Sequence, residues 1–363
     1  MKKMLSLAAV ACLMITGAMA EDLSEAFKNG KVSGDVVLHA ERQNNNGTTL
    51  DAGFTNGSLG LSYETGEYKS FKASVGFRAN SDFSEEEDGD FGGDETKALL
   101  HTANISYSSE FIDVIVGRQE IDLEWMGDFH EAYVAVVKPV ANLAFVLGYS
   151  DKYAVADADA ELEKFTKIGT DGAYVLDVKY SGIEGLGLNA YYYSANDIAD
   201  WYGAKVDYDT DMFGATAHYA SSNVDALVAP EDGSILHVEA RGNFADFGLK
   251  AGYISTDKDT GVDGIMNNVG DNISPFEDGN QVYVADSDTY YFGASYAIAG
   301  VELGAIYGES KYGTTNAKEK EFNFTADYGV TDELSLGLLF VDVSAEDSND
   351  DYNRIGFTAT YAF

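Results

Sequence analysis

Apolar and polar residues alternate with a period of two along most of the chain, and this pattern predicts β-strands. In the last ten residues one face is apolar, and it carries Ile355, Phe357, Ala359, Tyr361 and Phe363. A final strand that ends on an aromatic residue is typical of a transmembrane β-barrel, whose apolar face contacts lipid and whose polar face lines a wet interior. A soluble β-sandwich can also end on such a strand, so the interpretation depends on whether the pattern recurs.

The same pattern recurs in eighteen segments, which we predict as strands, with sixteen as the alternative count. They span residues 31–42, 52–64, 68–80, 97–108, 111–120, 129–138, 141–152, 172–181, 186–196, 201–208, 211–221, 234–243, 247–256, 288–298, 301–311, 319–328, 333–344 and 352–363. In 319–328 the face opposite Phe322 and Phe324 carries Glu319, Glu321 and Asp327. A face this acidic cannot form the dry core of a soluble sandwich, so it must contact water.

The connections between these segments alternate in length. Those after even-numbered strands are short, such as 109–110 and 299–300, and those after odd-numbered strands are longer and more acidic, such as 153–171 and 257–287. This alternation indicates short periplasmic turns and long external loops. Aromatic residues beside the short turns predict an interfacial girdle; they are Tyr63, Tyr107, Phe111, Tyr180, Tyr208, Phe247, Tyr296, Tyr328, Tyr361 and Phe363.

We therefore predict an all-β fold, a transmembrane antiparallel β-barrel of eighteen strands over residues 31–363. At ~4.8 Å strand spacing and ~40–45° tilt the backbone radius is ~19 Å, too wide for side chains alone to fill. The fold therefore implies a lumen.

Residues 1–20 have the features of a signal peptide, with Lys2 and Lys3, an apolar run and an Ala-Met-Ala cleavage site. The only cysteine, Cys12, lies in this segment, and a lipoprotein acylated there is the alternative interpretation. Residues 21–30 form a short periplasmic lead-in before the barrel. We expect an exported protein without disulfides in a bacterial outer membrane.

The chain is strongly acidic, with 61 Asp and Glu residues against 23 Lys and Arg residues and a net charge of -38. Loss of Lys2 and Lys3 with the signal peptide makes this charge -40. Nucleic-acid binding is excluded, because it requires basic residues. Acidic walls concentrate counter-ions, so we expect a preference for cations.

Several stretches resemble the Opr-type porins of Gram-negative bacteria, and more distantly the eighteen-stranded substrate-specific porins. They are residues 22–36, VGRQEID at 116–122, residues 172–193, FGLKAGYI at 247–254 and the closing strand. The resemblance implies passive diffusion of small hydrophilic solutes and a constriction made by the third external loop. That loop, residues 121–128, is short here, so we expect 153–170 or 257–287 to narrow the pore instead.

Charged residues on the polar face are the candidate pore-lining residues. The resemblance implies inward arginines opposite acidic loop residues, and we assign the basic side to Arg78, Arg118, Arg241 and Arg354. Alternation places Arg118 with Val114 and Val116, so an inward orientation requires a bulge or the strand's end. The other candidates are Glu120, Asp122, Glu124, Asp128, Asp177, Lys205, Glu239, Glu319 and Glu321. The alternative is that such charges only pair across neighbouring strands.

No residues with the spacing of a catalytic, metal or cofactor site stand out. The acidic stretches 85–90 and 257–264 offer oxygen ligands but lack EF-hand spacing, so solvated loop charge is the simpler interpretation. The five histidines are isolated, which disfavours a barrel hydrolase, and an adhesin or receptor is the other alternative. We expect no enzyme activity and no cofactor. The expected partners are lipid and lipopolysaccharide, small solutes and cations, the barrel-assembly machinery through the C-terminal strand, and two further copies if the barrel is a trimer rather than a monomer.

Overall fold

The computed structural model describes residues 22–92, 96–196, 198–225, 232–262 and 272–363. The predicted signal peptide lies outside these residues, as does part of the 257–287 connection. The lead-in contains the helix α1 (Leu23–Lys28), where the Asp22 side chain accepts a hydrogen bond from the Glu25 backbone N–H at 2.7 Å. No helix among the described residues has the length and apolarity needed to cross a membrane.

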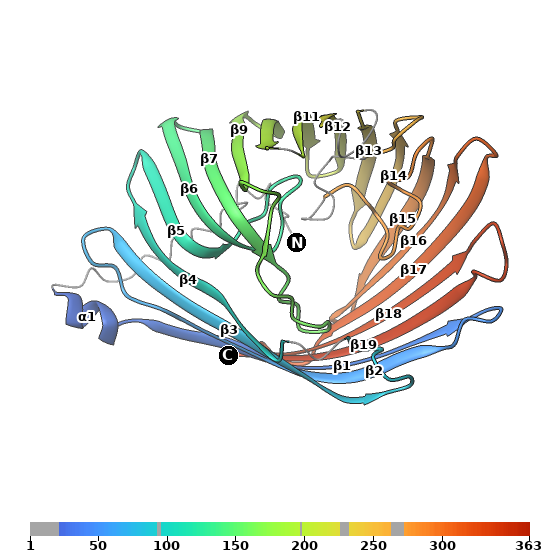
Figure 1. Ribbon diagram of the computed structural model, residues 1–363, viewed down its shortest axis with the longest axis horizontal. Helices are drawn as coiled ribbons and strands as arrows, with labels where there is room; N and C mark the ends of the chain where they lie inside the picture. The colour runs from blue at the N-terminus through green and yellow to red at the C-terminus, as the bar shows by residue number, and fades with distance from the viewer. Residues whose placement is uncertain (1–21, 93–95, 197, 226–231, 263–271) are drawn as a thin grey trace.

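The strands form one closed antiparallel barrel around a central opening (Figure 1). The long strands are β1 (Lys31–Asn45), β2 (Ala52–Glu64), β3 (Phe71–Glu85), β4 (Ala98–Ser108), β5 (Ile112–Glu120), β6 (Phe129–Val140), β7 (Leu143–Ala154), β9 (Ala173–Ile183), β10 (Leu186–Ala195), β11 (Ala199–Asp209), β12 (Phe213–Val224), β13 (Ser234–Phe244), β14 (Phe247–Thr256), β15 (Asp288–Ile298), β16 (Val301–Tyr312), β17 (Ala317–Gly329), β18 (Leu334–Ser344) and β19 (Tyr352–Ala362). The two-residue strand β8 (Thr166–Lys167) pairs only with the end of β7. The prediction of eighteen barrel strands is confirmed.

Pairing of β1 with β19 closes the ring, with Ala40 opposite Phe357 and Asn45 opposite Tyr352. Closure leaves no unpaired sheet edge in the wall, which is what a lipid environment requires of β-structure.

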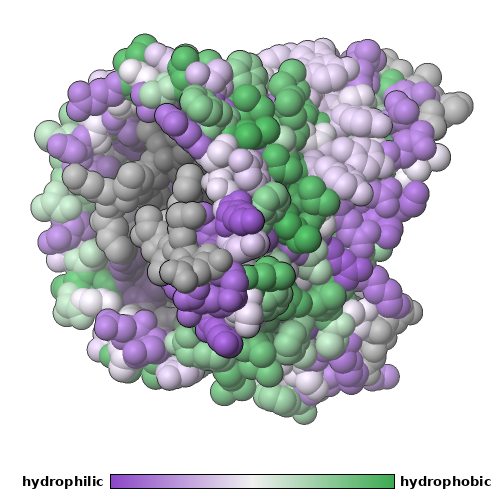
Figure 2. Space-filling view, turned by 90° about the vertical axis from the view of Figure 1, so that its left-hand side faces the viewer, coloured by the Kyte–Doolittle hydropathy of each residue, from purple (hydrophilic) through white to green (hydrophobic). Residues whose placement is uncertain are grey.

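The period-two pattern sorts apolar residues to the outside of the barrel. Ile355, Phe357 and Tyr361 are exposed, and the polar side chains between them face the interior. Most of the predicted girdle residues are also exposed, including Phe111, Tyr208, Phe247, Tyr328 and Phe363. Figure 2 shows hydrophobic side chains gathered on the outer surface beside a hollow that leads into the barrel.

Two details of the prediction were wrong. Strand β3 starts three residues later than expected and continues to Glu85, because the alternating pattern extends into the acidic stretch that we assigned to a loop. The length alternation also fails in two places: residues 196–198 and 313–316 are short connections on the side of the long loops.

Three connections on that side enter the barrel rather than projecting away from it (Figure 1). They are residues 121–128 between β5 and β6, residues 155–165 after β7, and residues 272–287 before β15. We call them the first, second and third inner loops. Together they occupy the lumen that the radius of an eighteen-stranded barrel leaves open.

Candidate pore constriction

The first inner loop is held on the inner wall by its buried tryptophan. The Trp125 indole N–H donates a hydrogen bond of 2.7 Å to the Tyr191 hydroxyl, which lies 2.9 Å from Nε2 of His218. Lys205 adds an ion pair of 3.1 Å to the Glu124 carboxylate. This short loop therefore enters the lumen but lies against the wall. Our expectation that residues 153–170 or 257–287 narrow the pore stays a prediction.

The same loop has an apolar underside. Ile121, Leu123 and Met126 pack near Val134 and Val146 on the inner faces of β6 and β7. This burial explains why a few inward wall positions are apolar in a barrel whose lumen is otherwise polar.

The second inner loop runs inside the barrel from the end of β7 to β2 and β3. Two asparagines hold it there, one on β2 and one on β3. The Asn80 amide donates to the carbonyls of Asp157 and Ala160, both at 2.7 Å, and the Asn56 amide donates to the carbonyl of Ala158 at 2.8 Å. Both asparagine side chains are buried, so these hydrogen bonds are shielded from water.

The third inner loop is held by inward carboxylates of β17. Glu321 accepts hydrogen bonds from the backbone N–H groups of Asp278, at 3.0 Å, and Gly279, at 2.8 Å. Asn323 accepts one from the backbone of Glu277 at 3.1 Å. Glu319 contacts the same loop through Gln281 at 3.4 Å. These two glutamates, which we predicted as pore-lining, therefore position a loop that narrows the pore.

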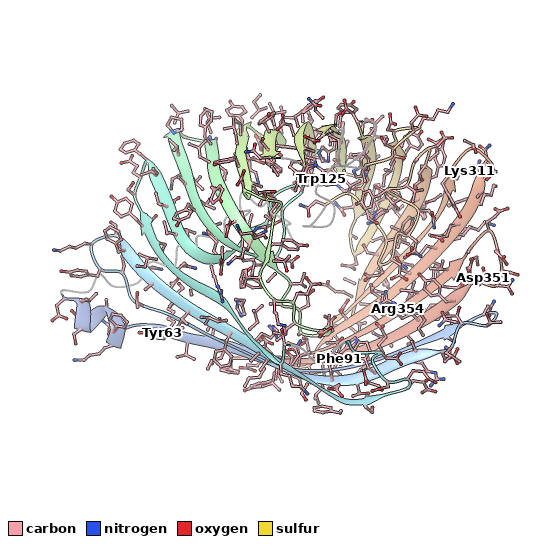
Figure 3. All side chains as sticks on the ribbon, in the orientation of Figure 1. Tyr63, Phe91, Trp125, Lys311, Asp351 and Arg354 are labelled. Carbon is pink, nitrogen blue, oxygen red and sulfur yellow. The ribbon has the colours of Figure 1, made fainter. Side chains whose placement is uncertain are left out.

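Arg354 joins this loop to the closure of the barrel. Its guanidinium donates to Glu41 on β1 at 2.8 Å and to Asp278 of the third inner loop, and the Tyr352 hydroxyl also donates to Asp278. An open recess of about 600 Å³ adjoins these groups. Its lining residues are Glu41, Gln43, Glu277, Asp278, Asn280, Tyr352 and Arg354. Figure 3 places Arg354 and Trp125 on opposite sides of the central opening.

Two other predicted arginines also face the interior, and each is paired with carboxylates. Arg78 forms two hydrogen bonds with Asp35, at 2.8 and 2.9 Å. Arg241 contacts Glu239 at 2.9 Å and Asp209 at 3.0 Å. The structure therefore distributes Arg78, Arg241 and Arg354 around the wall instead of collecting them in one cluster.

Arg118 lies beside the end of the second inner loop, 4.2 Å from the ring of Phe165, and its role as a pore-lining residue stays a prediction. Arg118 lies directly opposite Glu131 in the register. Glu131 follows the inward, fully buried His130 and shares the face of the exposed Tyr133, so alternation places both Glu131 and Arg118 on the outward face. Its guanidinium pairs with Glu131 at 2.8 Å. Gly117 has a φ of 119°, but the register continues through it without a shift, so no bulge turns Arg118 inward.

The remaining candidates divide into buried and exposed groups. Asp177 is fully buried on the inner wall, where it accepts hydrogen bonds from Asn189 at 2.6 Å and Tyr193 at 3.0 Å. Glu239 accepts one from Tyr291 at 2.8 Å. Glu120 and Asp122, at the start of the first inner loop, are exposed.

Asp128 ends the first inner loop in an acidic environment. Burial, together with repulsion from Asp157, Glu120 and Glu163, raises the pKa of its carboxyl to about 6. In the second inner loop, burial and the neighbouring Asp159 raise the pKa of Asp157. In the third, burial, Asp278, Glu321 and Asp159 raise the pKa of Glu277, which Arg354 partly offsets. Carboxylates of the three loops therefore act on one another across the opening.

The pKa of Asp128 makes a specific pH dependence testable. A raised carboxyl pKa means that the packed loop keeps a proton that a free Asp loses near pH 4. The retained proton stabilises the packed loop fully below about pH 4. This stabilisation falls as the pH rises towards the Asp128 pKa of about 6 and is absent above it. At pH 5 about nine-tenths of Asp128 is then protonated, and at pH 7.5 almost none.

We expect acidification from pH 7.5 to pH 5 to reduce cation selectivity, and Asp128→Asn to reproduce part of that change at pH 7.5. Reversal potentials of wild type and variant at both pH values measure this. If the reversal potential of the variant changes with pH as much as that of wild type, Asp128 does not contribute to the pH dependence.

Sequence reasoning missed the residues that hold the inner loops. Asn56, Asn80 and Tyr191 look like ordinary lumen residues until their loop partners are known. Trp125 carried the one local signal, because it is one of only two tryptophans in the chain and lies between acidic loop residues. Among the described residues no group of three or more His, Cys, Asp or Glu side chains has the geometry of a metal site.

Comparison with solved structures identifies the same fold in outer-membrane channels. The chain superposes on OccAB4 of Acinetobacter baumannii with a TM-score of 0.78 and 13% sequence identity, covering 92% of this chain and 98% of that one. OccAB1 of the same organism gives a TM-score of 0.78 at 13% identity, covering 96% and 99%. OpdK of Pseudomonas aeruginosa, solved with vanillate, gives 0.73 at 13% identity, covering 92% and 98%. No curated protein sequence matches the chain.

A family model described as Gram-negative porin matches residues 6–351, nearly the whole chain. This match agrees with the closed barrel, the inner loops and the wet lumen described above. The chain therefore belongs to the Gram-negative porin family, and it is a solute channel of the bacterial outer membrane.

Proposed function

We propose that this porin is a passive diffusion channel for small hydrophilic solutes that prefers cations to anions. The observation that carries the preference is the charge balance at the inner loops. The basic residues Arg78, Lys205, Arg241 and Arg354 each pair with at least one carboxylate, so the field of each is largely neutralised.

The inner loops, by contrast, carry carboxylates that have no ion pair in the described part of the chain. Asp157, Asp159 and Glu277 keep part of their surface in contact with the lumen although the surrounding loops partly desolvate Asp157 and Glu277, and their charges act on one another between the second and third loops. Like charges at a narrow point lower the energy of a passing cation and raise that of an anion. The paired arginines offer no comparable surplus for anions.

Ion selectivity in planar bilayers tests the proposal. We expect the wild-type reversal potential in a salt gradient to have the sign of cation preference. The triple variant Asp157→Asn, Asp159→Asn and Glu277→Gln should lose most of that potential, because it removes three charges at the opening and leaves the hydrogen bonds of Asn56 and Asn80 in place.

The matched control removes three exposed carboxylates from periplasmic turns, with Glu110→Gln, Glu184→Gln and Asp211→Asn. It changes the net charge equally and should leave most of the potential intact. Anion preference in the wild type would overturn the proposal, as would an equal loss of reversal potential in the triple variant and in the control. Swelling of liposomes in small uncharged solutes would distinguish a diffusion channel from a barrel adhesin or hydrolase.

A further inference from the structure

Strand β17 begins with alternating lysines and glutamates, and the pleat sorts them to opposite sides of the wall. Glu319 and Glu321 point inward and are 7% and 4% exposed, and they hold the third inner loop. Lys318 and Lys320 are exposed on the outward face. The inward half of this pattern has a role in the pore, whereas the outward half has none.

A third lysine joins the outward pair from the neighbouring strand β16. Lys311 lies directly opposite Lys318 in the register, and Lys320 lies directly opposite Glu309. Lys318 pairs with Glu309 at 3.0 Å, and the other two lysines also act on that carboxylate. Like charges directly opposite each other in a sheet are destabilising, and the single carboxylate of Glu309 offsets the repulsion between Lys311 and Lys318.

The other carboxylates beside these lysines are held by hydrogen bonds to other groups. Within the part of the chain that the structure describes, neither Lys311 nor Lys320 has a carboxylate within ion-pairing distance. Asp288 lies opposite Lys311 on the other side, and its carboxylate accepts a hydrogen bond from the Tyr253 hydroxyl. The Glu346 carboxylate accepts one from the Lys318 backbone N–H at 2.8 Å. A group of three lysines on two adjacent strands is unusual in a chain with 61 acidic and only 23 basic residues.

The lysines lie at the level of a membrane interface. Just below them, the outward aromatic side chains of Tyr290, Phe292 and Tyr307 are 55%, 54% and 49% exposed. Aromatic residues mark the depth of lipid headgroups. Figure 3 shows Lys311 at the same rim as Asp351, which belongs to an external loop, so this interface is with the outer leaflet.

We propose that Lys311, Lys318 and Lys320 form a docking site for the phosphate groups of a phosphorylated glycolipid of the outer leaflet. Three ammonium groups around one carboxylate supply the charge and hydrogen-bond donors that a phosphate requires. The exposed aromatic residues below would contact the acyl chains of the same molecule. Because the lysines adjoin an exposed apolar surface, the site fits a lipid better than free phosphate.

Native mass spectrometry of the folded barrel with bisphosphorylated lipid A tests the site. We expect the triple variant Lys311→Gln, Lys318→Gln and Lys320→Gln to bind at least about tenfold more weakly than wild type. The matched control removes three exposed lysines at the periplasmic end, with Lys28→Gln, Lys31→Gln and Lys69→Gln, and should bind like wild type. Wild type should bind lipid A without phosphates as weakly as the triple variant binds the phosphorylated form.

Slower migration of heated than unheated samples on denaturing gels identifies folded barrels, and only these enter the comparison. Equal affinity of wild type and triple variant for lipid A would overturn the proposal, as would equal affinity of wild type for the phosphate-free lipid. Oligomers of wild type that disappear in the triple variant, without a change in lipid binding, would assign the surface to a second copy of the chain and also overturn it.

Discussion

Replacing Asn56 and Asn80 together with alanine is expected to raise the single-channel conductance roughly twofold or more, because the second inner loop then loses its attachment to β2 and β3 inside the lumen. The two amides donate to three loop carbonyls at 2.7–2.8 Å. Each buried carbonyl that loses its donor costs about 1–3 kcal/mol unless it reaches water. Moving the loop towards the external solvent satisfies these carbonyls, and this favours the open position against the packing of Leu162 on Leu99.

Conductance of single channels in planar bilayers measures this effect. The matched control is Asn104→Ala with Asn189→Ala, because both side chains donate to wall strands, at 2.9 Å to Arg118 and 3.2 Å to Val178. It should leave the conductance close to wild type. If the Asn56 and Asn80 double variant folds and conducts like wild type, these residues do not hold the loop in the lumen.

The wall of this barrel could be predicted from sequence because each strand encodes its own two faces. Alternation in the closing strand sends Ile355 and Phe357 to the lipid side whatever the other strands do. Arg118 shows the strength of this local rule. Alternation placed it on the outer face, the family resemblance suggested the lumen, and the register follows the alternation.

The inner loops could not be placed in the same way, because their positions depend on partners far away in sequence. Asn80 and Ala160 are eighty residues apart, and neither residue type carries a signal for the other. Glu321 shows the same limit: alternation predicted that it faces water, but not that two backbone N–H groups of another loop would occupy its carboxylate. Side-chain direction is local information, whereas a loop's destination is not.

The second large effect is expected from Trp125→Ala, which should release the first inner loop from the wall. Trp125 is fully buried against Tyr191 and His218, and truncation of a buried tryptophan costs about 3–5 kcal/mol. Trp125→Phe retains most of the packing and loses one hydrogen bond, so it should cost only about 1 kcal/mol. We expect the alanine variant to admit larger solutes in liposome swelling and the phenylalanine variant to resemble wild type.

The second tryptophan of the chain provides the matched control. Trp201 is also buried on the inner wall, but its indole N–H has no hydrogen-bond partner among the described residues. Trp201→Phe therefore removes an unpaired polar group and should leave permeation unchanged. It also leaves Trp125 as the only tryptophan, so resistance of its fluorescence to acrylamide reports directly whether the loop lies against the wall. Ready quenching in a folded Trp201→Phe barrel would show that the first inner loop is already free, and the expected effect of Trp125→Ala would lose its basis.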